Sequence, residues 1–393
     1  MISSATGRDS AAWVRIAFAM FAVGWGANQF SPMLIVYRHE LSLSAGAVAG
    51  LFLVYALTLI PGLLIGGPAS DRFGRRPVVL PFVVLSPVAT LLLVLQPRSL
   101  ALITAGRALA GLCSGVAIGS ATAWVQELSA GDGLSARRSA LALTAGFGLG
   151  PVVAAALAQW APHPLVVPYL PHLVIGTAAA AVLWRTPAPP VPVRIRRPWP
   201  PAAVRTGKFW LAVAPAAPLV FGSVSLAIVV LPEEVTSARS LSAGFAGLMT
   251  VLSFSAGVAV QPLARRLRAV AGNAAGLCCA TAGTGLGIAA VAHSSRTLAG
   301  VAAVLLGLAY GLCLVSGLRQ AEQMASPDER GAVIACYYTV AYLGFAVPYL
   351  VDGLAAVSSR TGAFGLLTAI IAVSTLWTTG YAIHSGPNVA TGP

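Results

Sequence analysis

Apolar stretches long enough to cross a lipid bilayer follow one another along almost the whole of this chain. Of its 393 residues, 57% are hydrophobic and only 9% are charged. A soluble globular domain carries about 25% charged residues, because its surface faces water. The shortage of charge extends over the full length, so lipid must be the solvent for most of the surface. The sequence therefore predicts an all-α membrane protein that crosses the bilayer many times.

Each helical crossing needs around 20 apolar residues, because the hydrocarbon core is about 30 Å thick. Applied to this chain, that length predicts twelve transmembrane helices. They are expected at residues 13–37, 43–66, 77–96, 99–127, 137–160, 165–184, 209–231, 243–264, 272–293, 297–323, 331–357 and 361–384. Several of these segments contain Pro or paired Gly, which membrane helices tolerate when neighbouring groups satisfy the freed backbone atoms.

Basic residues are distributed unevenly between the two ends of the predicted helices. With the N-terminus inside, 17 of the 24 basic residues lie on the inner side and five on the outer side, while Arg107 and Arg319 lie within helices. Cytoplasmic loops carry the excess of Arg and Lys, so we expect a plasma-membrane protein with both termini in the cytoplasm. The net charge of +13 does not indicate nucleic-acid binding, because the basic residues form short clusters between apolar stretches.

The longest polar interruption, residues 185–208, is rich in Pro and Arg. We expect it to be a non-helical cytoplasmic linker that lies on the anionic inner leaflet. It divides the chain into a six-helix bundle at 1–184 and another at 209–393. Features near Gly67, Glu127 and Gly148 recur 190 to 197 positions later. Two related six-helix halves are typical of secondary transporters.

The segment between the second and third predicted helices has a distinctive pattern of Gly, Asp and Arg. It reads Gly67-Pro68-Ala69-Ser70-Asp71-Arg72-Phe73-Gly74-Arg75-Arg76. The first Gly permits close approach of helices, the last permits a tight turn, and the arginines hold the loop inside. Asp71 is suited to accept hydrogen bonds from the amides at a neighbouring helix N-terminus. A positive-inside loop with no further role is the simpler interpretation.

This pattern resembles G-x-x-x-D-R-x-G-R-R, the loop signature of the major facilitator superfamily. The resemblance implies two six-helix bundles that transport solutes by alternating access. It also implies that Asp71 meets the start of the eleventh helix and that Arg75 pairs with Glu127 of the fourth. Such contacts would form a latch that closes the cytoplasmic side and opens when the halves rock. Pro68 is unusual at its position, but every charged or Gly position agrees.

A second pattern, Gly146-Phe-Gly-Leu-Gly150-Pro151, lies in the fifth predicted helix. Small residues let helices pack tightly, and Pro bends a helix. The pattern is similar to the G-x-x-x-G-P signature of the exporter branch of this superfamily, which includes drug/proton antiporters of GC-rich bacteria. The Gly pair expected after the Pro is Ala154-Ala155 here. A generic packing face of small residues remains the alternative.

Arg107, in the fourth predicted helix, is followed by Gly111 and Gly115. A charged side chain within the membrane by default marks a functional site. The arrangement resembles the R-x-x-x-G pattern of the superfamily's fourth helix, which implies that Arg107 faces the central cavity and takes part in proton coupling. The alternative is an Arg that snorkels to the outer headgroups.

The first predicted helix lacks the acid that many proton-coupled relatives carry there and offers Asn28 and Gln29 instead. Neutral amides bind solutes but do not carry protons at ordinary pH. The other titratable or charged candidates are Asp352, His172, Arg319 and Glu322. We expect the last two, three positions apart in the tenth helix, to neutralise one another, with a coupling role as the alternative.

By resemblance, helices 1, 4, 7 and 10 line the central cavity. The polar candidates on them are Asn28, Gln29, Arg107, Ser223, Ser225, Tyr310 and Ser316. Further rings, some of which are alternatively interface anchors, belong to Tyr55, Phe254, Tyr337, Tyr338 and Tyr342. A cavity of amides, hydroxyls and rings with little charge suits a largely apolar or weakly polar organic solute.

We therefore expect a monomeric secondary transporter that exports a drug or secondary metabolite in exchange for protons and needs no cofactor. An importer or uniporter of a small polar metabolite is the alternative, and a membrane enzyme or channel is a remote one. The sequence has no nucleophile elbow, zinc-protease motif or P-loop. Its five cysteines fall inside apolar stretches without metal-site spacing, so we expect them to be small core residues.

Overall fold

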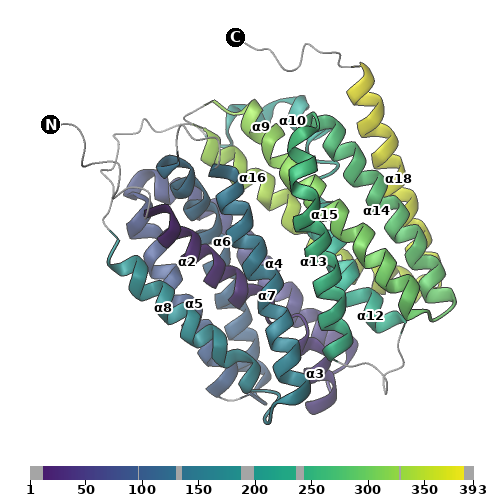
Figure 1. Cartoon of the computed structure of the whole chain (residues 1–393), viewed down its shortest axis with the longest axis horizontal. Coiled ribbons are helices and arrows are strands. Elements are labelled where there is room, and N and C mark those ends of the chain that lie inside the picture. Colours follow the sequence, from purple (N-terminus) through teal and green to yellow (C-terminus); the bar gives the residue numbers. More distant parts are fainter. Residues whose placement is uncertain are drawn as a thin grey trace. The chain divides into compact units, whose positions relative to one another are not determined.

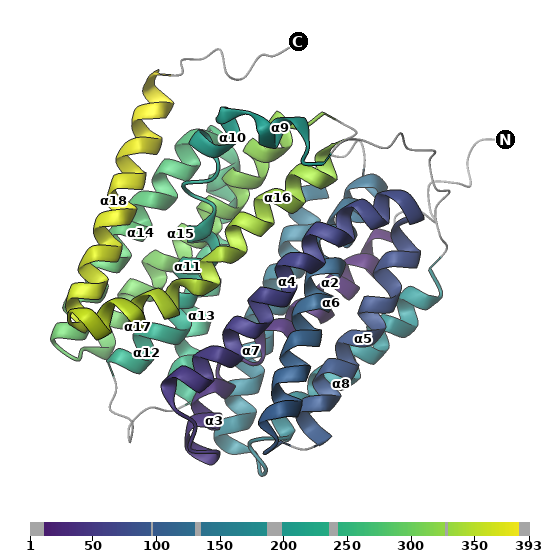
Figure 2. The same cartoon turned by 180° about the vertical axis from the view of Figure 1, so that it is seen from behind.

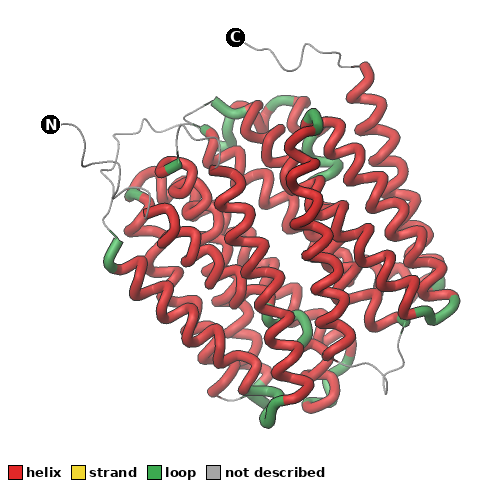
Figure 3. The backbone as a smooth tube through the Cα atoms, viewed as in Figure 1, coloured by secondary structure: helices red, strands yellow, loops and turns green. Residues whose placement is uncertain are grey.

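The computed structural model describes residues 12–95, 97–129, 135–186, 199–235, 243–326 and 329–384. Within these ranges the chain forms helices joined by short loops, and no strand occurs (Figure 1, Figure 3). Two compact units can be distinguished. The N-terminal unit comprises residues 1–196 and 242–247, and the C-terminal unit comprises residues 197–241 and 248–393.

Ten helices in the described part of the chain are long and apolar enough to cross a membrane, and they coincide with ten of the twelve predicted segments. Those in the first half are α4 (Ala45–Phe73), α5 (Arg75–Leu95), α6 (Leu100–Leu128), α7 (Ser135–Trp160) and α8 (Leu170–Trp184), the last preceded by η1 (Val167–Tyr169). Those in the second half are α13 (Ala243–Arg266), α14 (Ala269–Ala292), α15 (Arg296–Met324), α16 (Arg330–Tyr342) with η3 (Leu343–Ala346) and α17 (Val347–Val357), and α18 (Arg360–His384).

The first and seventh predicted segments are interrupted. In the first, α2 (Ala12–Asn28) and α3 (Met33–Glu40) are separated by turns. The seventh is divided into α10 (Gly207–Ala212), α11 (Pro218–Ser225), the π-helical η2 (Leu226–Val230) and α12 (Leu231–Glu234). Pro32 precedes α3 and Pro218 begins α11, and proline has no amide hydrogen with which to continue a helical ladder. Twelve crossings therefore stay a prediction.

Part of the predicted linker, residues 187–198, lies outside the described residues. The described remainder contains α9 (Ala202–Arg205) and the start of α10. The expectation of a non-helical segment is therefore wrong for residues 202–205 and 207–208. Pro201 precedes this turn in an extended conformation, so the prolines lie before the helical turn and do not interrupt it.

The outer faces of the helices carry large apolar side chains, as lipid contact requires. Val174 of α8 is 71% exposed and Leu376 of α18 is 74% exposed. The cysteines are found on both faces of the helices: Cys113, Cys313 and Cys336 are buried, but Cys278 of α14 is exposed. The expectation of a core position is wrong for Cys278, because the lipid-facing side of a membrane helix is as apolar as its packed side.

Glycines of α6 let this helix approach α4 to backbone contact. A Cβ atom at Gly111 would overlap the carbonyl oxygen of Tyr55, and one at Gly115 would overlap that of Leu59. The two helices lie side by side within the N-terminal unit (Figure 2). Only a residue without a side chain fits at these two positions.

The same arrangement recurs between α15 and α13. A Cβ atom at Gly307 would overlap the carbonyl oxygen of Ser253, and one at Gly311 would overlap that of Gly257. These glycines lie 196 positions after their counterparts in α6, and the two carbonyls lie 198 positions after theirs in α4. The two halves of the chain therefore repeat one mode of helix packing.

Candidate functional site

The turn between α4 and α5 consists of the single residue Gly74. Its φ of 92° is a backbone conformation that residues with a side chain rarely adopt. The turn places Arg75 beside the end of the preceding helix, where its Nη2 lies 2.7 Å from a carboxylate oxygen of Asp71. Gly74 thus makes the tight turn expected of it.

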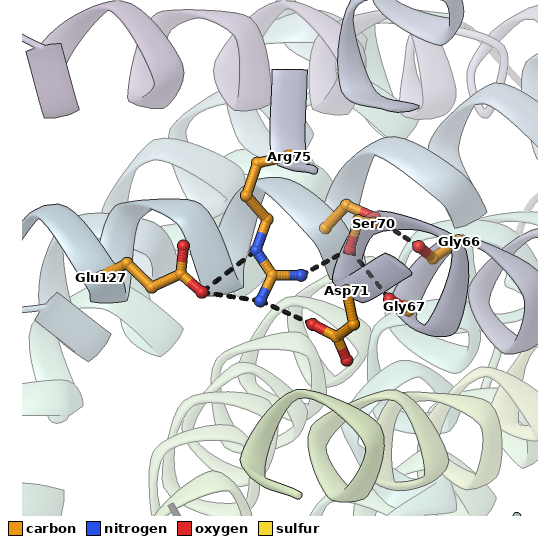
Figure 4. Close-up of polar contacts among 7 residues, drawn as sticks. Gly66, Gly67, Ser70, Asp71, Arg75 and Glu127 are labelled. Carbon is orange, nitrogen blue, oxygen red and sulfur yellow. Dashed lines mark hydrogen bonds and ion pairs between the residues drawn. The ribbon is translucent and has the colours of Figure 1, made fainter. Parts of the chain in front are cut away.

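Arg75 is only 5% exposed and uses all three of its nitrogens. Its Nε and Nη2 donate to Oε1 of Glu127 at 3.2 and 2.7 Å, and its Nη1 donates to the Ser70 hydroxyl (Figure 4). Ser70 in turn donates to the carbonyl oxygen of Gly67 at 2.9 Å. Charge-assisted hydrogen bonds of this kind are about twice as strong as neutral ones. Ser70, which the sequence did not single out, completes the cluster.

The two other arginines of the motif have different surroundings. Arg72 is exposed, and its guanidinium lies 5.0 Å from the ring centroid of Phe73. Arg76 donates from Nη2 to the carbonyl oxygen of Trp184 at 2.6 Å, at the C-terminus of α8. A helix C-terminus attracts a cation because its last carbonyls carry partial negative charge. Arg76 therefore holds the loop onto α8, outside the cluster around Arg75.

The small residues of α7 pack this helix against α2. A Cβ atom at Gly146 would overlap the carbonyl oxygen of Phe21, and one at Gly150 would lie 2.8 Å from that of Trp25. Pro151 lies inside α7. The Asn28 side chain adds a polar link, since its Nδ2 donates to the carbonyl oxygen of Phe147 at 2.8 Å.

Arg107 is 1% exposed, so it does not snorkel to the headgroups. Its Nη1 donates to the carbonyl oxygen of Ala27 at 3.2 Å, and its Nε donates to that of Leu51 at 3.3 Å. The rings of Phe30 and Tyr55 lie 4.2 and 4.4 Å from the guanidinium carbon. The carbonyl of Ala27 is available because α2 stops one residue later, and the last four carbonyls of a helix lack partners within it.

A series of hydrogen-bonded polar side chains connects the turn after α2 to α5 and α8. Gln29 donates from Nε2 to the Thr90 hydroxyl at 3.2 Å, and this hydroxyl is hydrogen-bonded to Nδ1 of His172 at 2.7 Å. All three residues are buried. In the described part of the chain, Oε1 of Gln29 and Nε2 of His172 have no hydrogen-bond partner. The sequence singled out Gln29 and, more weakly, His172, but nothing in it marked Thr90.

The ring of His172 packs directly over Gly26, where a Cβ atom would overlap it. Gly26→Ala is therefore expected to destabilise the N-terminal unit by about 1–3 kcal/mol, the usual cost of overpacking a tight core. Thermal unfolding in detergent measures the loss. Gly46→Ala is the control, because no atom lies within 4 Å of a Cβ there. In the double variant with His172→Ala the clash should disappear, and a double variant less stable than both single ones would contradict this explanation.

The aromatic candidates in the C-terminal unit belong to a buried group of rings. Phe221 stacks on Tyr342 with a centroid distance of 4.2 Å, and Tyr310 lies edge-on to Phe254 at 5.5 Å. Tyr338 is 2% exposed, so these tyrosines are not interface anchors. Among the described residues, the buried hydroxyls of three candidates have no hydrogen-bond partner; they belong to Ser223, Ser225 and Ser316.

Arg319 caps the end of α13 instead of pairing with Glu322. Its Nη1 donates to three backbone carbonyls at 3.0 to 3.3 Å, those of Ala264, Arg265 and Leu267. The expected neutralisation within α15 is therefore wrong for Arg319. The physical reason is the end of α13 at Arg266, which leaves carbonyls without helical partners and so attracts a cation.

Asp352 belongs to an ion cluster at the surface of the C-terminal unit. Its side chain is 43% exposed and accepts from Nη1 of Arg360 at 2.6 Å. The same nitrogen lies 3.2 Å from Glu234. Burial raises the pKa of the Glu234 carboxyl above its ordinary value, and the positive charge of Arg360 opposes this rise. The structure thus places Asp352 away from the buried candidates.

Comparison with known proteins agrees with this architecture. A model of the Major Facilitator Superfamily matches residues 16–221 and again residues 213–388. The chain is also 31% identical, over 143 residues, to the Bacillibactin exporter of Bacillus subtilis (strain 168). That alignment covers 34% of this chain and 36% of the relative. The family model matches both halves of the chain, and the repeated glycine contacts show that the two halves are built alike. The chain therefore belongs to the Major Facilitator Superfamily and is a membrane transporter, not an enzyme.

Proposed function

We propose that this transporter exports small organic compounds in exchange for protons, by alternating access of two six-helix halves. The observation that carries the direction is the contact between α7 and α2. Gly146 and Gly150 bring the two helices to backbone contact, and they belong to a pattern similar to the signature of exporters. The partial similarity to a bacillibactin exporter supports the same direction. We place the monomeric protein in the plasma membrane, with both termini in the cytoplasm.

The cluster around Arg75 is proposed to be the latch of the cytoplasmic side. Arg75 is buried, carries a full charge and links α4, α5 and α6 through Asp71, Ser70 and Glu127. A network of this kind has a well-defined geometry that is lost when any helix moves. It is therefore suited to stabilise one conformation of the transport cycle more than the other.

Transport into proteoliposomes with an imposed pH gradient tests this function, with bacillibactin, the compound named for the relative, as the first probe. An acidic vesicle interior should drive accumulation at least several-fold above the equilibrium level, because protons leave as the solute enters. Collapse of the gradient by a protonophore should abolish that accumulation. If bacillibactin only equilibrated across the membrane whatever the pH gradient, the proposal of proton exchange would be refuted and the protein would be a uniporter. No movement of bacillibactin would refute it as a substrate.

A further inference from the structure

Arg107 places a positive charge in the interior of the N-terminal unit. It lies seven residues after the start of α6, which is about 10 Å along the helix at ~1.5 Å per residue. Contacts from the same unit enclose it on several sides, from Phe30, Tyr55 and the carbonyls of Ala27 and Leu51. A charge at this depth is costly and by default serves a function.

The described acids of this unit all lie elsewhere. Glu40 is at the end of α3 beside Arg98, and Asp71 and Glu127 are at helix ends beside Arg75. The titratable side chain that contacts the guanidinium is Tyr55, whose ring lies 4.4 Å from the guanidinium carbon. Among the described residues, Arg107 therefore has no carboxylate partner.

The hydrogen bonds of Arg107 leave part of its guanidinium unused. Nε and Nη1 donate to backbone carbonyls, whereas Nη2 has no acceptor within the described ranges. Carbonyl dipoles and ring faces attract a cation, but they carry no net charge. A buried charge without an opposite charge is unfavourable, and the planar fork of Arg fits an oxyanion with two acceptors.

From this arrangement we infer that Arg107 binds the negative charge of the transported solute, so that the solute is an organic anion and not an organic cation. The inference rests on the proposed transport function and names its substrate class. A carboxylate beside Nη2 would supply the missing acceptor and the missing charge together. An ammonium group at the same place would meet an unscreened like charge and would be excluded.

Counterflow exchange in proteoliposomes with equal pH on both sides tests this inference. The probes are three compounds of one shape and different charge: 2-naphthoate, 2-naphthamide and 2-naphthylmethylammonium. The wild-type protein should exchange the carboxylate at least tenfold faster than the ammonium. Faster exchange of the ammonium would overturn the inference, and so would exchange of none of the three.

Variants show whether Arg107 causes the preference. Arg107→Gln should lower the ratio of naphthoate to naphthamide exchange about tenfold, and Arg107→Lys should restore much of it. The ratio guards against misfolding, because a misfolded fraction lowers both rates equally. Arg98→Gln removes an arginine that is 70% exposed and should leave the ratio unchanged. An unchanged ratio in Arg107→Gln would overturn the inference.

The assay also separates this inference from the proposed proton exchange. Counterflow needs no pH gradient, so a uniporter of organic anions would still show the carboxylate preference. Conversely, transport that responds to the pH gradient but is fastest for the ammonium compound would support the proposed function and contradict the inferred anionic substrate. Addition of a 100-fold excess of chloride tests whether Arg107 binds an inorganic anion instead. If chloride removed the preference for the carboxylate, the site would be a chloride site, and the inference of an organic anion would be overturned.

Discussion

Arg75→Leu should destabilise the protein by about 2–3 kcal/mol and slow transport at least tenfold. The substitution removes the cation that lies 2.7 Å from both Asp71 and Glu127, so two carboxylates are left close together without it. Breaking a fully buried pair costs about 3–5 kcal/mol. The expected loss is smaller here because Glu127 is 37% exposed and water screens part of its charge. Thermal unfolding in detergent and proteoliposome transport measure the two effects.

Arg98→Leu is the matched control for this prediction. Arg98 pairs with Glu40 at 3.8 Å and is 70% exposed, so its loss should cost less than about 1 kcal/mol. Arg75→Lys tests the geometry, because a lysine keeps the charge but lacks the planar fork that reaches several acceptors. If Arg75→Leu were as stable as Arg98→Leu, the buried network would contribute nothing. If it were unstable but transported at the wild-type rate, the latch would be refuted and only a structural role would remain.

The transmembrane segments were predictable from the sequence to the extent that hydropathy determines them. Ten long spans follow from runs of about 20 apolar residues, which only a helix can carry across lipid. The interruptions before Pro32 and before Pro218 did not follow, because hydropathy does not register a broken hydrogen-bond ladder. In the first segment, the interruption frees the carbonyl that Arg107 binds.

The candidate site was predictable where its contacts are local or carried by a motif. Gly74 makes the tight turn that the loop pattern predicted, and Arg75 contacts Glu127, as the motif implied. Contacts between distant segments were not predictable in the same way. A local rule paired Arg319 with a neighbour in its own helix, whereas its acceptors lie 52 to 55 positions away at the end of α13. Thr90 has no sequence signal at all, because its role depends on the approach of α8.

The anion inference also narrows the expected solute. Amides, hydroxyls and rings predicted a weakly polar compound, and the sequence left open whether Arg107 was compensated. Arg107 is buried, with two carbonyls and no described carboxylate as partners. The solute is therefore expected to carry a negative charge as well. Hydropathy and motif alone place an arginine in a helix, but only its surroundings show whether the charge is balanced.

Gly115→Ala and Gly311→Ala should each destabilise the protein by about 3 kcal/mol, the upper end of ordinary overpacking. In both cases the new methyl group would overlap a backbone carbonyl, of Leu59 or of Gly257. A carbonyl in a helix cannot rotate away without breaking its hydrogen bond, so the two helices must separate along their length. The equivalent positions in the two halves should give losses of similar size, measured as thermal unfolding of purified protein in detergent.

Gly285→Ala provides the control within a membrane helix, since no atom lies within 4 Å of a Cβ at that position of α14. It should be neutral or stabilising, because Ala favours a helix over Gly by about 1 kcal/mol. The double variant Gly115→Ala/Gly311→Ala should lose about the sum of the two single losses, since the two contacts share no residue. If Gly115→Ala were as stable as Gly285→Ala, backbone contact between α6 and α4 would not be what requires glycine. If only one half were sensitive, the repeated packing would not be energetically equivalent in the two halves.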